Sequence, residues 1–261
     1  MNQLLQLPVW LCGAIIVGSF VLIAVAGLPF FQWLSVGRLK LTEEMNNDII
    51  FFASAIAVFY SLTVGLIAVG VWSTYTNVED IISAEASSIG VLYRDVSCYS
   101  EPNRTTLREH VRGYTEIIIN HAWPAQAQRQ TLDDATRHLT VIDNELFHFE
   151  PTTTGQQLLH AETLRRYNDV VNLRRQRLHA IGAGLPSVMW CVVLVGAILT
   201  ISVTYLLKID RFVQFVLTGF LAMFIGLVVF VIASLDEPLS GPLAIDSHPY
   251  EMILDRLIDL K

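Results

Sequence analysis

Four apolar runs without a single charged residue divide this sequence. Each is 22 to 24 residues long, and they cover residues 9–31, 49–72, 186–207 and 212–235. A helix needs about 20 apolar residues to cross the hydrocarbon core of a bilayer. Inside lipid, every backbone N–H and C=O group must be satisfied within the chain, which selects helices for isolated spans. The sequence therefore predicts a multi-pass integral membrane protein with four transmembrane helices and the lipid bilayer as its solvent.

The overall composition supports this interpretation. Only 16% of the residues are charged and the mean hydropathy is +0.49, whereas average soluble domains carry about 25% charged residues. The first run also admits a second interpretation, because Ala24 and Ala26 form the A-x-A pattern of a signal-peptide cleavage site. That run lacks a basic leader and is long for a signal peptide, so we expect a retained span.

The spans are arranged as two pairs separated by a long polar segment. We expect a first transmembrane hairpin, a helical cytoplasmic domain, a second transmembrane hairpin and a C-terminal tail with a short amphipathic helix, at residues 1–72, 73–185, 186–235 and 236–261. The predicted fold class is all-α. An even number of spans places both termini and the inserted domain on one side of the membrane.

The polar segment has the apolar periodicity of helices throughout. The first helix continues from the second span to about Tyr99, and Trp123-Pro124 is expected to end the next. A fourth helix of this segment begins near Gln156 and leads toward the third span. The tail helix carries an apolar stripe that needs a partner surface. We expect the tail helix to pack on the polar segment, and a helix that lies on the membrane surface is the alternative.

Several functional classes are disfavoured. The net charge of −7 argues against nucleic-acid binding. The histidines and the three cysteines show no metal-ligand spacing, and no nucleophile–base pair is evident, so we expect no metal, no cofactor and no enzyme activity. Proton-coupled transporters need ionisable groups inside the membrane, and the four runs contain no charged residue. A passive pore and a non-conducting membrane protein both remain open.

The second span carries two helical stripes that suggest different roles. Small residues recur every four positions, a spacing that lets helices approach closely in lipid; they are Ala53, Ala57, Ser61 and Gly65. A bulky stripe runs beside them and is the candidate pore lining: Ile49, Phe52, Ile56, Phe59 and Thr63. If several copies surround an axis, the bulky stripe forms a hydrophobic constriction that gates by dewetting. Facing lipid is the alternative for this stripe.

Glu85 is the charged residue that fits its surroundings least. It interrupts the buried face of a helix whose neighbouring positions are aliphatic. A buried carboxylate needs a charge partner or several hydrogen bonds. We expect either an ion pair that locks the domain, with Arg112 or an arginine of the fourth helix as partner, or a ring of carboxylates that faces an axial passage.

Two stretches resemble the bestrophin-like membrane proteins, a family distantly related to the bestrophin anion channels. The first comprises "ISAEASSIGVLYR" and "LREHVRGYTEIIINHAWP". The second is "LDEPLSGPL", which contains a D-x-P-x-x-G pattern after the last span, formed by Asp236, Pro238 and Gly241. Together with the order of the spans, the resemblance extends over nearly the whole chain.

The resemblance implies a function as well as a fold. Bestrophins are pentameric channels for chloride and other small inorganic anions, with the second span lining the pore and a helical domain inside the cell. It therefore implies a homo-oligomeric ion channel, a pentamer first, in a bacterial inner (plasma) membrane. The calcium site of true bestrophins uses a dense acidic run that this chain lacks, so calcium gating is not inferred. A non-conducting scaffold or accessory subunit, whose helical domain binds a protein partner, is the competing function.

Overall fold

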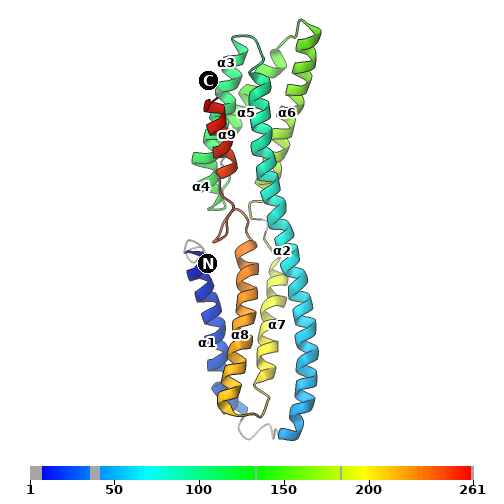
Figure 1. The fold of residues 1–261 in the computed structure, drawn as a ribbon, viewed down its shortest axis with the longest axis vertical. Helices are drawn as coiled ribbons and strands as arrows, with labels where there is room; N and C mark the ends of the chain where they lie inside the picture. Colours follow the sequence, from blue (N-terminus) through cyan, green and yellow to red (C-terminus); the bar gives the residue numbers. More distant parts are fainter. Residues whose placement is uncertain (1–7, 36–41, 133, 183, 260–261) are drawn as a thin grey trace. The chain divides into compact units, whose positions relative to one another are not determined.

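The computed structural model describes residues 8–35, 42–132, 134–182 and 184–259, and these contain helices and no strand. Residues 36–41 of the expected loop between the first two spans lie outside the described part. In chain order the elements are α1 (Val9–Ser35), η2 (Glu43–Met45), α2 (Asn46–Val96), α3 (Asn103–Ile117), η3 (Ile118–Ala122), α4 (Trp123–Gln126), α5 (Asp134–His148), α6 (Thr154–His179), α7 (Ser187–Thr204), α8 (Arg211–Leu235) and α9 (His248–Asp259) (Figure 1).

The chain forms two compact units. One, the spanning unit, comprises Met1–Thr74 and Gly184–Asp236, and the other, the helical domain, comprises Tyr75–Ala183 and Glu237–Lys261. Helix α2, with 51 residues, contributes to both units. The C-terminal helix α9 belongs to the helical domain.

Four helices are long and apolar enough to cross a membrane, and they are the four predicted from the apolar runs: α1, the helical segment Glu43–Val96, α7 and α8. In the spanning unit they lie side by side in the order α1, α8, α7, α2 (Figure 1). Helix α1 packs along α8. A separate hydrogen bond joins α1 to the end of α7, because the Tyr205 hydroxyl donates to the Ala24 carbonyl at 2.7 Å. The neighbour of the first span is therefore the last span.

Helix α2 meets α7 through one aromatic side chain. The Tyr60 hydroxyl donates to the Val193 carbonyl at 3.2 Å. A Cβ atom at Gly196 would collide with the Tyr60 ring, so only glycine permits this approach. Of the four membrane-length helices, the segment containing α2 is the least buried within one chain.

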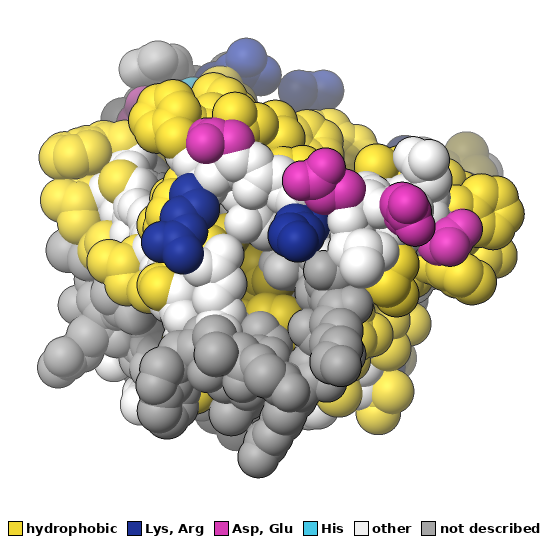
Figure 2. Space-filling model, turned by 90° about the horizontal axis from the view of Figure 1, so that it is seen from below, with side chains coloured by type: hydrophobic (Ala, Val, Ile, Leu, Met, Phe, Trp, Pro, Cys, Tyr) yellow, Lys and Arg dark blue, Asp and Glu magenta, His cyan; other side chains and the backbone are white. Residues whose placement is uncertain are grey.

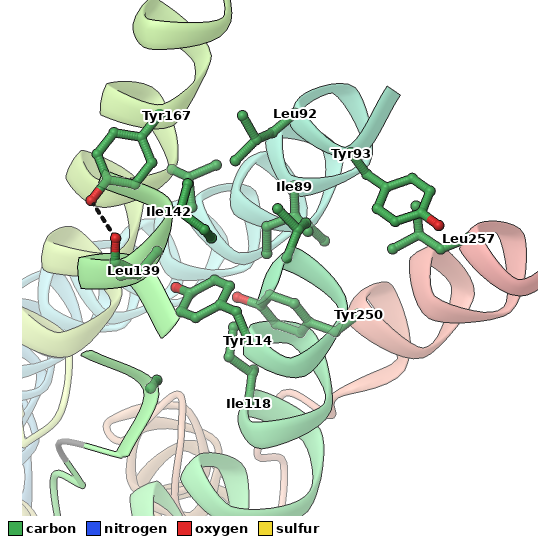
Figure 3. Close-up of a cluster of buried hydrophobic side chains, with 14 of the residues drawn as sticks. Ile89, Leu92, Tyr93, Tyr114, Ile118, Leu139, Ile142, Tyr167, Tyr250 and Leu257 are labelled. Carbon is green, nitrogen blue, oxygen red and sulfur yellow. Dashed lines mark hydrogen bonds between the residues drawn. The ribbon is translucent and has the colours of Figure 1, made fainter. Parts of the chain in front are cut away.

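The core of the helical domain lies where α2, α3, α5, α6 and α9 converge (Figure 3). Its largest fully buried apolar side chains recur at helical spacing on α2, on α3 with the π turn η3 that follows it, and on α5: Ile82, Ile89, Leu92, Leu107, Ile118, Ile142 and Leu146. Helix α9 adds Tyr250 and Leu257 to this core. The amphipathic tail helix thus packs on the polar segment and buries its apolar stripe there.

The expected helix end at Trp123-Pro124 is wrong. Helical backbone continues from α3 through the π turn η3 and into α4, which ends at Gln126. Pro124 lies in the first turn of α4, directly after the π turn.

Candidate functional site

The bulky stripe of the second span lies mostly on an uncovered face of α2. Phe52 is 65% exposed and Phe59 is 72% exposed, and Thr63 is exposed as well. Ile49 and Ile56 are half-buried. An adjacent face of α2 carries the buried Val64 and Val71 and lies toward the rest of the spanning unit. A large apolar surface on α2 is therefore left for lipid or for other copies of the chain.

The small-residue stripe is divided between these two environments. Ala53 and Ala57 are half-buried, whereas Ser61 and Gly65 are exposed. The Ser61 hydroxyl donates to the Val58 carbonyl of its own helix at 3.0 Å. A Cβ atom added at Gly65 would meet nothing within 4 Å. Within the described part of a single chain, no contact therefore requires glycine at this position.

Charged residues frame the loop end of the spanning unit. Figure 2 shows this end, with acidic and basic side chains gathered over it between apolar rims. Among the described residues, the exposed charged side chains here are Glu43, Glu44, Asp48, Lys208, Asp210 and Arg211. This group of acidic and basic side chains suits the interface between the hydrocarbon core and water.

Glu85 lies in the middle of the helical domain and is completely buried. It projects from α2 between the core residues Ile82 and Ile89. Arg177, near the end of α6, faces it with its side chain 1% exposed, and the Arg177 Nε donates to Glu85 Oε2 at 2.7 Å. The Arg177 Nη2 donates to Oε1 at 3.1 Å, which makes the pair bidentate. Arg112 instead pairs with Glu116 of its own helix at 2.9 Å.

Two tyrosines complete the coordination of the carboxylate. The Tyr114 hydroxyl of α3 donates to Glu85 Oε1 at 2.9 Å, and the Tyr250 hydroxyl of α9 donates to Oε2 at 3.0 Å. In Figure 3 both rings are drawn within the same core, Tyr114 from α3 and Tyr250 from α9. Each carboxylate oxygen therefore accepts one phenol and one guanidinium hydrogen bond, and four helices meet at one anionic group.

Aromatic rings cover the guanidinium. The Arg177 Cζ lies 5.9 Å from the centre of the Trp123 ring and 5.8 Å from that of Tyr250. These distances fall within the range of cation–π attraction. The Arg177 Nη1 is buried and has no hydrogen-bond partner among the described residues. On this side the guanidinium therefore lies near two aromatic rings.

The electrostatics of this cluster hold the phenols neutral and the guanidinium charged. Burial, followed by the Glu85 charge, raises the pKa of Tyr114 and of Tyr250 well above 10. Burial lowers the pKa of Arg177, but the Glu85 carboxylate and its hydrogen bonds outweigh this and the net shift is upward. The cluster is thus a buried structural unit in which both oxygens of the Glu85 carboxylate are fully hydrogen-bonded.

Sequence reasoning did not single out Tyr114 and Tyr250 as partners of Glu85. Both residues lie in predicted apolar stripes, and their hydroxyl groups are the available signal, because a buried tyrosine hydroxyl usually finds a hydrogen-bond partner. A second missed feature is a contact between His110 of α3 and His138 of α5, whose Nδ1 atoms are 3.2 Å apart. These two residues are 28 positions apart and no spacing rule connects them.

The residues of the D-x-P-x-x-G pattern have local structural roles. In the spanning unit, Asp236 accepts the Leu185 N–H at 2.6 Å and the Trp190 Nε1–H at 3.1 Å, which fixes the start of α7. In the helical domain, the Pro238 carbonyl accepts the Ile245 N–H at 2.8 Å. Gly241, inside that loop, has a φ of 122°, a conformation that favours glycine.

Comparison with known proteins identifies the fold and the family. The bestrophin-like domain family matches residues 17–250. No sequence match is found among curated proteins. Two crystal structures of point mutants of a bacterial bestrophin homologue from Klebsiella pneumoniae are similar, with TM-scores of 0.69 and 0.70 and identities of 11% and 10%. Each alignment covers 95% of this chain and 98% or 99% of the other.

A third solved structure agrees with the two mutants from Klebsiella pneumoniae. A crystal structure of a mutant described only as a membrane protein gives a TM-score of 0.67 at 11% identity, over 95% of this chain and 98% of that chain. The all-helical architecture with four long apolar helices is thus the bestrophin fold, and the protein is an integral membrane protein. With the family match extending over most of its length, the chain belongs to the bestrophin-like family.

Proposed function

We propose that this protein is an ion channel that conducts small anions, such as chloride, passively through a central pore lined by α2. The observation that carries the proposal is the uncovered bulky face of α2, with Phe52 and Phe59 largely exposed in a single chain. Copies of this helix around an axis would stack these side chains as apolar rings, which gate a narrow passage by dewetting. The bestrophin fold supports this arrangement, and the small anion follows the family resemblance.

The proposal includes a topology and an assembly. Both termini and the helical domain face the cytoplasm, the spans form the two expected hairpins, and the membrane is the bacterial inner membrane. The chain is a homo-oligomer, a pentamer first. Ile49, Ile56 and Thr63 line the pore with the two phenylalanines, while the small-residue stripe packs against a neighbouring helix.

In the helical domain, Glu85 holds α2 in place. An ion pair with two added phenol donors restricts the rotation of the helix that continues from the pore-lining segment. The alternative position for Glu85, facing an axial passage, is disfavoured by its complete burial within one chain.

The competing function is a non-conducting scaffold or accessory subunit. Two apolar side chains on the helical domain favour it, because Phe147 is 73% exposed and Leu158 is 71% exposed. A protein partner would cover such residues.

The mass of the detergent-solubilised protein, measured together with a structure of the assembly, separates the two functions. The channel requires a symmetric oligomer with α2 around a continuous axial passage. A monomer, or a dimer with a closed interface, would support the scaffold.

A further inference from the structure

Two imidazole rings meet between α3 and α5, outside the Glu85 cluster. The ring centres of His110 and His138 are 5.2 Å apart and their Nδ1 atoms are 3.2 Å apart. Gly113 of α3 makes room for the second ring, because a Cβ atom there would lie 2.5 Å from Cε1 and 2.9 Å from Nδ1 of His138. The contact is therefore a fitted junction between the two helices.

The hydrogen bond in this junction limits how many protons it can hold. An Nδ1···Nδ1 bond needs a protonated Nδ1 on one ring and a free lone pair on the other. One imidazolium beside a neutral ring satisfies this requirement. Two imidazolium rings would place two N–H groups against each other and two positive charges at close range. The second protonation therefore breaks the bond.

The charged groups near the pair add to this effect. Burial lowers the pKa of His138, and the charges of His110 and Arg137 lower it further, while the hydrogen bond with His110 and the charge of Glu116 oppose them. Glu116 is itself paired with Arg112 at 2.9 Å, which weakens its pull on the imidazole. From α6, Arg174 approaches the same stretch of α5 through a 2.8 Å bond from its Nη2 to the Thr136 hydroxyl. At His138 the lowering causes, burial first, outweigh the raising ones, and the net shift of its pKa is downward.

Helix α3 connects this junction with the Glu85 cluster. His110 and Tyr114 are four residues apart and share one face of the helix. His110 contacts α5, while Tyr114 donates to the Glu85 carboxylate of α2. A change in the packing of α3 on α5 therefore acts on the helix from which Tyr114 donates to Glu85.

We propose that the His110–His138 pair is a proton-sensitive latch between α3 and α5, closed at neutral pH and opened by acidification. Because the folded-state pKa of His138 lies below the ordinary histidine value of about 6.5, its contribution to stability is complete above that pH. The contribution is lost as the pH falls through the folded-state value. The latch is a property of the domain and does not depend on ion conduction.

Thermal unfolding of the full-length protein in detergent tests the latch. Melting temperatures are measured at pH 7.5 and pH 5.5 in EDTA, for wild type, His138→Asn and His148→Asn. Asparagine keeps a hydrogen-bonding nitrogen near the place of Nδ1 and does not titrate. His148 is the matched control, since it is exposed and its Nδ1 bonds to the Asn144 carbonyl of its own helix at 2.7 Å. We expect acidification to lower the melting temperature of wild type and His148→Asn by about 2–4 °C more than that of His138→Asn. An equal acid shift in all three proteins would overturn the proposal.

A titration of protein labelled with ¹³C at histidine Cε1 provides the second measurement, and its deciding result comes from the wild type. We expect one resonance, assigned to His138, to titrate below pH 6.5 and to move toward 6.5 in His110→Gln. A His138 resonance that titrates at or above 6.5 in wild type would overturn the proposal.

Discussion

The Arg177 guanidinium donates from Nε to the Glu85 carboxylate at 2.7 Å, with neither side chain reaching solvent. This pair joins α2 to α6, and Tyr114 and Tyr250 attach α3 and α9 to the same carboxylate. Removing both charges from water is costly, and the bidentate geometry with two further donors offsets that cost. The stability of the helical domain should depend strongly on the charge of Glu85.

Replacement of that charge is the first test. Glu85→Gln leaves a buried guanidinium without its counter-charge, which costs about 3–5 kcal/mol of folding free energy. Glu116→Gln, which removes the half-exposed pair with Arg112, should cost under about 1 kcal/mol. Denaturant unfolding of the detergent-solubilised protein measures both. Equal losses in the two variants would show that the buried pair has no special weight.

The docking of α9 depends on one hydroxyl group. Tyr250→Phe removes a donor to a carboxylate, a loss of about 1.5–3 kcal/mol. Hydrogen exchange in α9 should accelerate accordingly. Tyr75→Phe is the control, because the exposed Tyr75 hydroxyl donates to the Leu243 carbonyl at 3.1 Å. Unchanged exchange in α9 after Tyr250→Phe would mean that apolar contacts alone hold the helix.

Substitutions at two glycines distinguish an effect on oligomer assembly from an effect on the folding of the chain. Gly65→Leu introduces a side chain where one chain offers open space, whereas Gly196→Leu drives a side chain into the Tyr60 ring. We expect Gly65→Leu to reduce the oligomer size while the helical content and the melting temperature of each chain stay close to wild type. Gly196→Leu should destabilise the chain itself. An intact oligomer in Gly65→Leu, seen by native mass spectrometry, would show that the small-residue stripe is not an interface.

Cysteine labelling in intact cells tests the proposed orientation of the protein in the membrane. In a cysteine-free background, Asn47→Cys near the start of α2 should react with an impermeant maleimide from outside. Gln157→Cys, on the helical domain, should react only after the cells are opened. Both positions are exposed in the structure. The reverse pattern would place the helical domain on the outer side.

The long spans could be predicted because lipid imposes a length and an apolarity that few other segments meet. The pairing of α1 with α8 could not be predicted in the same way. Helices that are apolar on every side carry little periodic signal, so their neighbours depend on individual contacts, such as the hydrogen bond from Gln32 of α1 to Gln214 of α8. The fold class was accessible from the sequence, and the packing order within the spanning unit was not.

For the Glu85 cluster, spacing indicates burial and electrostatics indicates the need for a partner. The polar segment offers eleven arginines, and only the tertiary structure selects Arg177. Tyr250 is even less accessible to sequence reasoning, since it lies 165 residues away on a helix whose apolar stripe gives no information about its partner. The contact between His110 and His138 could not be predicted either, because the tertiary structure alone brings their two helices together.

The most direct test of the proposed function is ion flux into reconstituted vesicles. Wild type is compared with Ile56→Ala/Phe59→Ala, and Leu217→Ala/Phe220→Ala serves as the matched control on the exposed face of α8. Shortening the side chains of the constriction should widen and wet it. We predict that the α2 variant conducts more than wild type, that the α8 variant equals wild type, and that anions pass more readily than cations. Flux of cations alone would reject the anion assignment and keep the channel, whereas no flux from wild type or from the α2 variant would contradict the channel.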